Sequence, residues 1–176
     1  MRSSSEFTNP LPLRYTALGL LMGGPRHGYE LHRDFLAQFG AVWHAGRSQF
    51  YAELNALAAV GLVRVTTVPQ AGRPPRRVFE IAPAGREAFL TWARAPVPHI
   101  RQVRVEFLTK LHFFELLSLP GAPALISAQI DVCRRRLVAL TAGPAATRFD
   151  ETVCDFRRRQ IEAIVSWLES CRERLR

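Results

Sequence analysis

The sequence predicts a mainly α-helical fold with one small β-hairpin, and two observations predict it. Apolar residues recur at spacings of three and four along most of the 176-residue chain, which is typical of amphipathic helices. Only residues 62–81 combine alternating β-branched residues with a turn-rich centre, the pattern of a hairpin. With 48% hydrophobic and 22% charged residues, the chain is globular and has room for two small domains. We expect a disordered tail at residues 1–10, one domain at 11–97 and a second, helical domain at 98–176.

Two short helices are expected first. One lies in "LRYTALGLLM", behind two prolines and before a stop at Gly23 and Gly24. The next follows Pro25 and is expected to end at Gly40. Its buried face is formed by residues at helical spacing, namely Gly28, Leu31, Phe35 and Phe39. This stripe predicts that the second helix packs one face on the core.

A third helix is expected from about Ser48 to Val60, with Ser48 as its N-cap and Gly61 as its stop. Its apolar stripe consists of Phe50, Leu54, Leu57 and Ala58. The opposite face carries only small and polar residues, which are Ser48, Ala52, Asn55, Ala56 and Ala59. A helix with such an outer face can approach another surface closely.

A hairpin and a fourth helix complete the first domain. The segments "LVRVTTV" and "RRVFEI" are the expected strands, and "PQAGRPP" is the turn-rich tip between them. The fourth helix is expected from about Pro83 until Pro96 and Pro98 break it. Between Glu53 and Glu80 the sequence holds four arginines and no acidic residue, so the hairpin is strongly basic.

The second half of the chain is predicted to be entirely helical. Apolar stripes run along residues 100–119, along residues 123–141 and along the last helix. In the last helix they follow the a/d spacing of a coiled coil, and such a seam needs a partner helix. We expect that partner to come from a second copy of the chain. The residues expected at the dimer interface are Phe107, Leu111, Phe114, Ile161, Ile164, Leu168 and Cys171.

The order of these elements and the formal charge of +9 favour double-stranded DNA as a partner. In a helix-turn-helix, the second helix of the pair enters the major groove and its N-terminal residues reach base edges. The residues expected there are Arg47, Ser48, Gln49 and Asn55. The hairpin is then a wing, whose expected DNA contacts are Arg73, Pro74, Arg76 and Arg77. His27, at the start of the second helix, is expected to place backbone N–H groups near a phosphate.

Other interpretations of the same residues stay open. The alanine-rich face of the third helix would also suit packing against another helix, and the hairpin arginines would also suit a solvated turn. As an alternative function, the basic surface would serve a winged-helix interaction module that binds an acidic protein. Substitution of Arg47, Arg73 and Arg77 by alanine discriminates the two, because lost phosphate contacts flatten the salt dependence of DNA binding.

Three stretches resemble the PadR family of winged-helix transcriptional regulators: "ALGLLMGGPRHGYEL", "SQFYAELNALAAVGLV" and "GRPPRRVFEIAPAGREAF". The resemblance is close over residues 13–95 and looser beyond, where it is similar to the long form with a C-terminal helical dimerisation domain. By position, it adds Tyr51 to the DNA-contacting surface. Gln49 and Phe50 depart from the Gly-Thr and aliphatic residue of many members. The resemblance implies a homodimeric repressor that recognises a pseudo-palindrome and is sometimes released by a small aromatic effector.

Tryptophans are the expected walls of a pocket for such an effector, because stacking and desolvation suit a planar molecule. The candidates are Trp43, Trp92 and Trp167. The expected pocket lies between the two domains and involves Trp92 and the helix starting near Ile100. The alternative is that these tryptophans belong to the core or to an interface.

Several classes of protein are excluded by what the sequence lacks. It has no GxSxG element, P-loop or dinucleotide fingerprint, so we expect no catalytic residues, no cofactor and no enzyme. The cysteines, Cys133, Cys154 and Cys171, have no metal-ligand spacing, so no metal is expected. The N-terminus lacks a signal-peptide core and the longest apolar run is too short to span a bilayer, which indicates a cytoplasmic protein without membrane contact.

Overall fold

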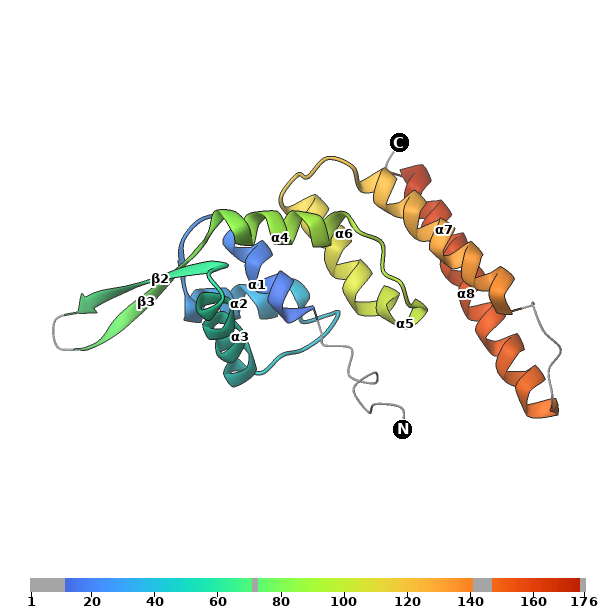
Figure 1. Ribbon diagram of the computed structural model, residues 1–176, viewed down its shortest axis with the longest axis horizontal. Coiled ribbons are helices and arrows are strands. Elements are labelled where there is room, and N and C mark those ends of the chain that lie inside the picture. The colour runs from blue at the N-terminus through green and yellow to red at the C-terminus, as the bar shows by residue number, and fades with distance from the viewer. Residues whose placement is uncertain (1–11, 71–72, 141–146, 175–176) are drawn as a thin grey trace.

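The structure is a computed structural model in which the N-terminal part is built around a central helix. The residues it describes are 12–70, 73–140 and 147–174, except for the side chains of Gln70, Arg73 and Pro74. The first three helices are α1 (Leu13–Leu21), α2 (Gly28–Phe39) and α3 (Arg47–Ala59). Helix α1 contacts α2, α3 and the later helix α4, so it lies at the centre of this part (Figure 1).

Helix α3 confirms the predicted apolar stripe and corrects the predicted start. Phe50, Leu54 and Leu57 are buried. The helix begins at Arg47 behind the extended Gly46, so Ser48 lies within the first turn and the prediction that it is the N-cap is wrong. At the other end Gly61 has a φ of 73°, which confirms it as the stop because glycine adopts this conformation without steric cost.

The sheet has three antiparallel strands in the order β1-β3-β2. Strands β2 (Val63–Gln70) and β3 (Arg73–Ile81) form the predicted hairpin, which projects from the helices in Figure 1. Strand β1 (Arg26–His27) was not predicted, because two residues carry no alternating pattern. It pairs with Val78 and Phe79, so β3 is the central strand.

Helix α4 (Pro83–Arg94) follows the hairpin as predicted and packs tightly against its base. A Cβ atom on Gly85 would lie 2.1 Å from the carbonyl oxygen of Leu62. Only glycine at position 85 therefore lets α4 lie this close to Leu62, the residue before β2. The same carbonyl oxygen accepts a hydrogen bond from the backbone N–H of Ala82 at 3.0 Å.

The predicted helix at residues 100–119 is present, but its geometry changes along its length. It consists of α5 (Ile100–Gln102), a π-helical turn η2 (Val103–Phe107) and α6 (Leu108–Leu116). A π-turn is a single wider turn within a continuous helix, and such turns are frequent at functional sites.

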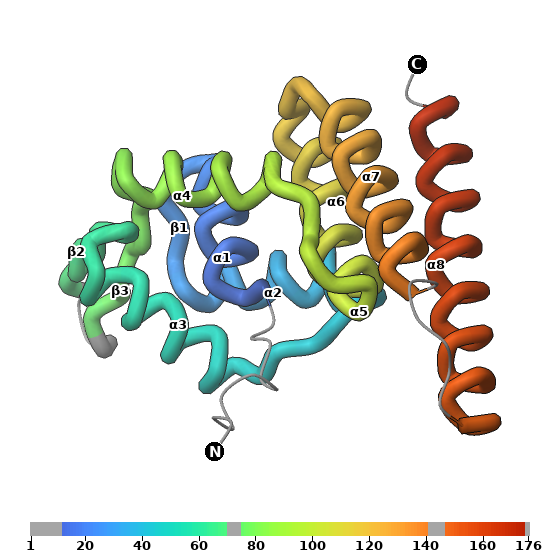
Figure 2. The backbone as a smooth tube through the Cα atoms, turned by 45° about the vertical axis from the view of Figure 1, so that its right-hand side comes forward, coloured from blue at the N-terminus to red at the C-terminus, as the bar shows by residue number. Residues whose placement is uncertain are grey.

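The last two helices, α7 (Ala122–Leu140) and α8 (Arg148–Arg174), pack side by side (Figure 2). Figures 1 and 2 both show that the first turns of α8 extend beyond the end of α7. Within the described ranges, the prediction of an entirely helical second half is confirmed.

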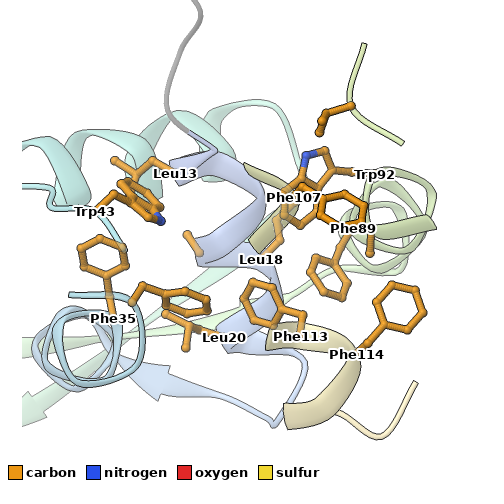
Figure 3. Packing of buried hydrophobic residues seen from close by; sticks show 14 of the residues in the cluster. Leu13, Leu18, Leu20, Phe35, Trp43, Phe89, Trp92, Phe107, Phe113 and Phe114 are labelled. Atoms are coloured by element: carbon orange, nitrogen blue, oxygen red, sulfur yellow. The ribbon is translucent and has the colours of Figure 1, made fainter. Parts of the chain in front are cut away.

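One continuous core joins the two halves of the chain. Phe113 of α6 lies 5.1 Å, between ring centroids, from Phe89 of α4 and 5.0 Å from Phe39 of α2. A Cβ atom on Gly19 would lie 2.4 Å from the same phenylalanine ring, so α1 and α6 also meet closely. Figure 3 shows Phe89 and Phe113, together with other aromatic side chains, near α1. Burial of such rings supplies much of the stabilising apolar contact.

Candidate nucleic-acid interface

The outer face of α3 exposes most of the residues that were predicted to contact bases. The exposed ones are Arg47, Ser48, Gln49 and Asn55, and Tyr51 is half-buried. Glu53 is the acidic residue of this helix, and its Oε1 accepts a hydrogen bond from Arg14 Nε of α1 at 2.9 Å. The helix therefore presents no uncompensated carboxylate to an anionic partner.

The hairpin of β2 and β3, hereafter the wing, adds positive charge to this face. Arg64, Arg76 and Arg77 are exposed. Within the described residues, Arg47, Arg64 and Arg76 form no ion pair, so their charges are free to meet phosphates. Arg73 and Pro74 lie in β3 next to the tip, outside the part whose side chains are described.

Asn55 and Arg77, which were predicted as two separate DNA contacts, contact each other. Arg77 Nη1 donates a hydrogen bond to Asn55 Oδ1 at 2.8 Å. The guanidinium carbon of Arg77 also lies 5.1 Å from the centroid of the Phe79 ring, a cation–π distance. The middle of β3 and the middle of α3 are thus joined through side chains.

The N-terminus of α2 is less open to a phosphate than the sequence predicts. The backbone N–H of His27 donates to Glu30 Oε2 at 3.0 Å, so this donor is already paired. The carboxylate of Glu30 also offsets the positive end of the helix dipole. The ring of His27 faces the wing instead, with Nδ1 3.4 Å from the carbonyl oxygen of Arg77.

Tyr51 connects α3 to the start of α2. A Cβ atom on Gly28 would lie 2.7 Å from Tyr51 Cε1, so the tyrosine ring rests where any other residue would place its side chain. A cavity of about 490 Å³ opens beside this contact, and residues of α2, α3 and the wing line it, among them His27, Tyr29, Tyr51, Arg76 and Arg77. The three elements therefore surround one concave, mainly basic surface.

The sequence analysis did not name two exposed residues, which are Tyr29 of this surface and Arg64 of the wing. Tyr29 is 60% exposed, and it falls outside the apolar stripe of α2, which is the signal that could have identified it. Arg64 lies on β2 in the stretch without acidic residues, and the alternation of a strand places it on the same face as Thr66. Both features are visible in the printed sequence.

Two of the three candidate tryptophans, Trp43 and Trp92, are buried in the core. Trp92 is buried, stacks on Tyr15 at 5.0 Å and donates from Nε1 to Glu106 Oε1 at 2.8 Å. Trp43 is also buried and donates from Nε1 to Thr109 Oγ1 at 3.1 Å. Their rings are covered by the chain itself.

A cavity lies beside the helix that starts at Ile100, and the third candidate, Trp167, lines it. It measures about 420 Å³ and lies between the α5–η2 segment and α8. Its apolar lining includes Val103 and Ile164, and Arg101 and Arg104 also line it. Apolar walls with a few charged groups are typical of small-molecule sites.

The seam of the last helix is filled mainly within the chain. Phe107, Phe114, Ile161 and Leu168 are buried, while Leu111, Ile164 and Cys171 are half-buried. Helix α7 of the same chain supplies the partner helix of α8. This corrects the argument that the seam needs a second copy, because a/d spacing indicates a partner helix without telling which chain provides it.

A buried ion pair lies between α4 and the π-turn. Lys110, the only lysine of the chain, is 2% exposed, and its Nζ lies 3.1 Å from Glu106 Oε1 and donates to the carbonyl oxygen of Ala95 at 2.8 Å. Its ammonium group also lies 4.9 Å from the Trp92 ring centroid. Burial lowers the pKa of Lys110, and the nearby Glu106 carboxylate opposes that shift.

Cys133 is a core residue, and burial raises the pKa of its thiol. A protonated thiol is a poor nucleophile and a poor metal ligand. Within the described ranges, no three His, Cys, Asp or Glu side chains are grouped so that they could hold a metal ion. In the same part of the chain, no helix combines the length and the apolar character needed to cross a membrane.

Comparison with known proteins identifies relatives of the region that carries this surface. Residues 17–90 match the model of the transcriptional regulator PadR-like family. The negative transcriptional regulator PadR of Bacillus subtilis is 29% identical over 125 residues, which are 71% of this chain and 69% of that protein. The probable transcriptional regulator Rv1176c of Mycobacterium tuberculosis is 38% identical over 82 residues, which are 47% of this chain and 43% of that protein.

Among solved structures, the chain is similar to Bacillus subtilis PadR in complex with operator DNA. The TM-score is 0.48 and the sequence identity 25%, and the alignment covers 93% of this chain and 99% of the other.

Proposed function

The chain belongs, through residues 17–90, to the PadR-like family of DNA-binding transcriptional regulators, and we propose that it acts as a homodimeric repressor on a pseudo-palindromic operator. Membership of a family of regulators also confirms the prediction that the protein is not an enzyme. A regulator of transcription works where the DNA is, so we place the protein in the cytoplasm.

The observation that carries the proposed DNA contact is the common surface of α3 and the wing. Arg47 at the start of α3 and Arg64 and Arg76 on the wing are exposed and form no ion pair in the described part of the chain. The contact of Arg77 with Asn55 brings the wing to the same side as the outer face of α3. A winged helix needs a helix that fits the major groove and a basic hairpin beside it. Helix α3, whose outer face carries small residues, and the wing have this arrangement.

The proposed repressing role is supported by the relative that is named a negative transcriptional regulator. A repressor acts by occupying DNA that transcription requires, so affinity for an operator is sufficient and no further chemistry is needed.

The proposed dimer is supported by the part of α8 that α7 leaves uncovered. Phe149 and Phe156 are 74% and 65% exposed and lie seven residues apart, so they share one face of the helix. Large aromatic side chains on one exposed helix face favour a protein partner. A second copy also doubles the few base pairs that one winged helix reads.

The proposed small aromatic effector fits the cavity between α5–η2 and α8. Ile100, Ile164 and Trp167 give it apolar walls, and Arg101 and Arg104 suit an anionic group on a planar molecule. Titration with phenolic acids should quench the fluorescence of Trp167, and Trp167→Phe should remove that response. Unchanged fluorescence together with unchanged operator affinity would contradict the effector proposal.

A footprint on the DNA upstream of the protein's own gene tests the proposed function. We expect protection of two inverted half-sites whose centres lie about one helical turn, or a multiple of it, apart, because a two-fold dimer imposes that spacing. Disruption of one half-site should weaken protection of the other. A single protected site, unaffected by its mirror image, would contradict a dimer on a pseudo-palindrome.

A further inference from the structure

The contact between Asn55 and Arg77 uses the atoms that each residue would need for DNA. An asparagine pairs with adenine by accepting through Oδ1 and donating through its amide nitrogen. Here Oδ1 accepts from Arg77 Nη1 at 2.8 Å, the distance of a charge-assisted hydrogen bond. The oxygen that would face a base is therefore directed at the wing.

Arg77 is held from more than one side. Its guanidinium lies over the ring of Phe79. Phe79 is fully buried, so Arg77 rests on a side chain of the core. Its backbone lies in the central strand, where it pairs with Thr67 of β2 and where its neighbour Val78 pairs with His27 of β1. Arg77 thus joins α3 to the place where all three strands meet.

The neighbouring arginine differs in these respects. Arg76 is exposed, and within the described residues it makes no ion pair or side-chain hydrogen bond. Arg76 lines the cavity between α2, α3 and the wing beside Arg77, but it takes no part in the contact with Asn55. Of the two, Arg76 has the geometry of a free phosphate contact.

We propose that Asn55 and Arg77 form a latch that fixes the angle between α3 and the wing, so that Asn55 is a positioning residue and not a base reader. This angle sets the distance between the residues of α3 that would enter the major groove and the residues of the wing that would contact DNA phosphates. The latch therefore determines whether both contacts fit one operator at the same time. This inference rests on the proposed function, because its consequence is measured on DNA.

Hydrogen exchange of the DNA-free protein tests the latch independently of the operator. Asn55→Ala should increase amide exchange in the peptide covering residues 73–81, because the wing loses its tie to α3. Gln49→Ala is the matched control, since Gln49 is exposed on the same helix and should leave that exchange unchanged. Equal exchange in the wild type and in Asn55→Ala would overturn the latch.

A double-mutant cycle on operator DNA tests its consequence. Asn55→Ala should weaken operator binding about tenfold in the wild type and have almost no effect in the Arg77→Ala background, because coupled residues are not additive. The salt dependence should keep its slope in Asn55→Ala, whereas Arg76→Ala should lower the slope by about one. If the double variant loses operator affinity by the product of the two single fold-changes of Asn55→Ala and Arg77→Ala, the latch is overturned.

Asn55→Asp separates positioning from base reading. Aspartate keeps an acceptor for Arg77 but has no amide donor for adenine. The latch predicts that Asn55→Asp keeps the wild-type preference at every operator base pair, although its negative charge lowers affinity for all sequences alike. Loss of preference at one base pair would make Asn55 a base reader and overturn the latch. If the wild type does not distinguish the operator from scrambled DNA, the proposed function fails while the exchange result still decides the latch.

Discussion

At the scale of single residues, Lys110 is unusual because its side chain is buried, whereas lysine is normally exposed. A buried ammonium group costs free energy, and here Glu106, the Ala95 carbonyl oxygen and the Trp92 ring offset that cost. Glu106 accepts from Trp92 Nε1 and from Gln102 Nε2 at 2.9 Å, so its position is also fixed. These contacts tie α4 to the π-turn and α6.

The pKa of Lys110 leads to a prediction for stability at alkaline pH. Because burial lowers this pKa in the folded state, the unfolded chain binds more protons between the folded and the ordinary pKa. The free energy of unfolding contributed by Lys110 therefore rises with pH over that interval and is constant below it. Urea denaturation at pH 7 and pH 10 should show that rise in the wild type relative to Lys110→Met.

Glu106→Gln gives the matching change on the other partner. It should lower the free energy of unfolding at pH 7 by about 3 kcal/mol, because the ammonium stays buried without its anion. Identical pH dependence in the wild type and in Lys110→Met would contradict the account of this pair.

The residues also show how far a sequence predicts a site. The stripe Phe50, Leu54 and Leu57 was predictable because burial follows the helical period. That Asn55 faces Arg77 was not predictable, because the contact joins residues 22 apart through the packing of the wing on α3. The burial of Trp92 depends likewise on contacts with Tyr15 and Glu106, which lie far from it in the sequence.

At the scale of elements, helices with long apolar stripes and the hairpin were predictable, and short or irregular elements were not. Strand β1 has two residues and exists only because β3 offers it a pairing edge. The π-turn at Val103–Phe107 leaves the apolar spacing of its helix nearly unchanged, so no pattern indicates it. The seam of α8 predicted a partner helix, and packing assigned that role to α7.

The uncovered part of α8 leads to a prediction for assembly. Helix α8 has 27 residues and α7 has 19, so α7 is too short to cover all of α8, and the first turns of α8 extend beyond it (Figures 1 and 2). The change Phe149→Ser together with Phe156→Ser should shift the protein from dimer towards monomer, measured as mass by light scattering at micromolar concentration. Both side chains are largely exposed, so the change should leave thermal unfolding of the monomer nearly unaltered.

Leu116→Ser is the control for this change, because Leu116 is 42% exposed on α6 and lies outside the first turns of α8. It should leave the dimer intact. A double variant that remains a dimer would place the interface on another surface.

At the scale of the whole molecule, two features decide how DNA binding is connected to the second half of the chain. The aromatic core around α1 is continuous from α2 to α6, so α2, α3 and the α5–α6 helix are packed together in one body. The cavity beside Trp167 lies between that body and α8. An effector bound in this cavity would contact both that body and α8. By changing how the two pack, it would change the spacing of the two wings in a dimer.

The most direct test of the account is fluorescence anisotropy with DNA from upstream of the protein's own gene and with a scrambled duplex, each at several salt concentrations. The account predicts tight, selective binding to the upstream DNA at physiological salt. It also predicts a salt slope that falls by about one in each of Arg47→Ala and Arg76→Ala. Equal and weak binding to both duplexes, with a slope that neither change alters, would contradict the claim that α3 and the wing form a DNA-binding surface.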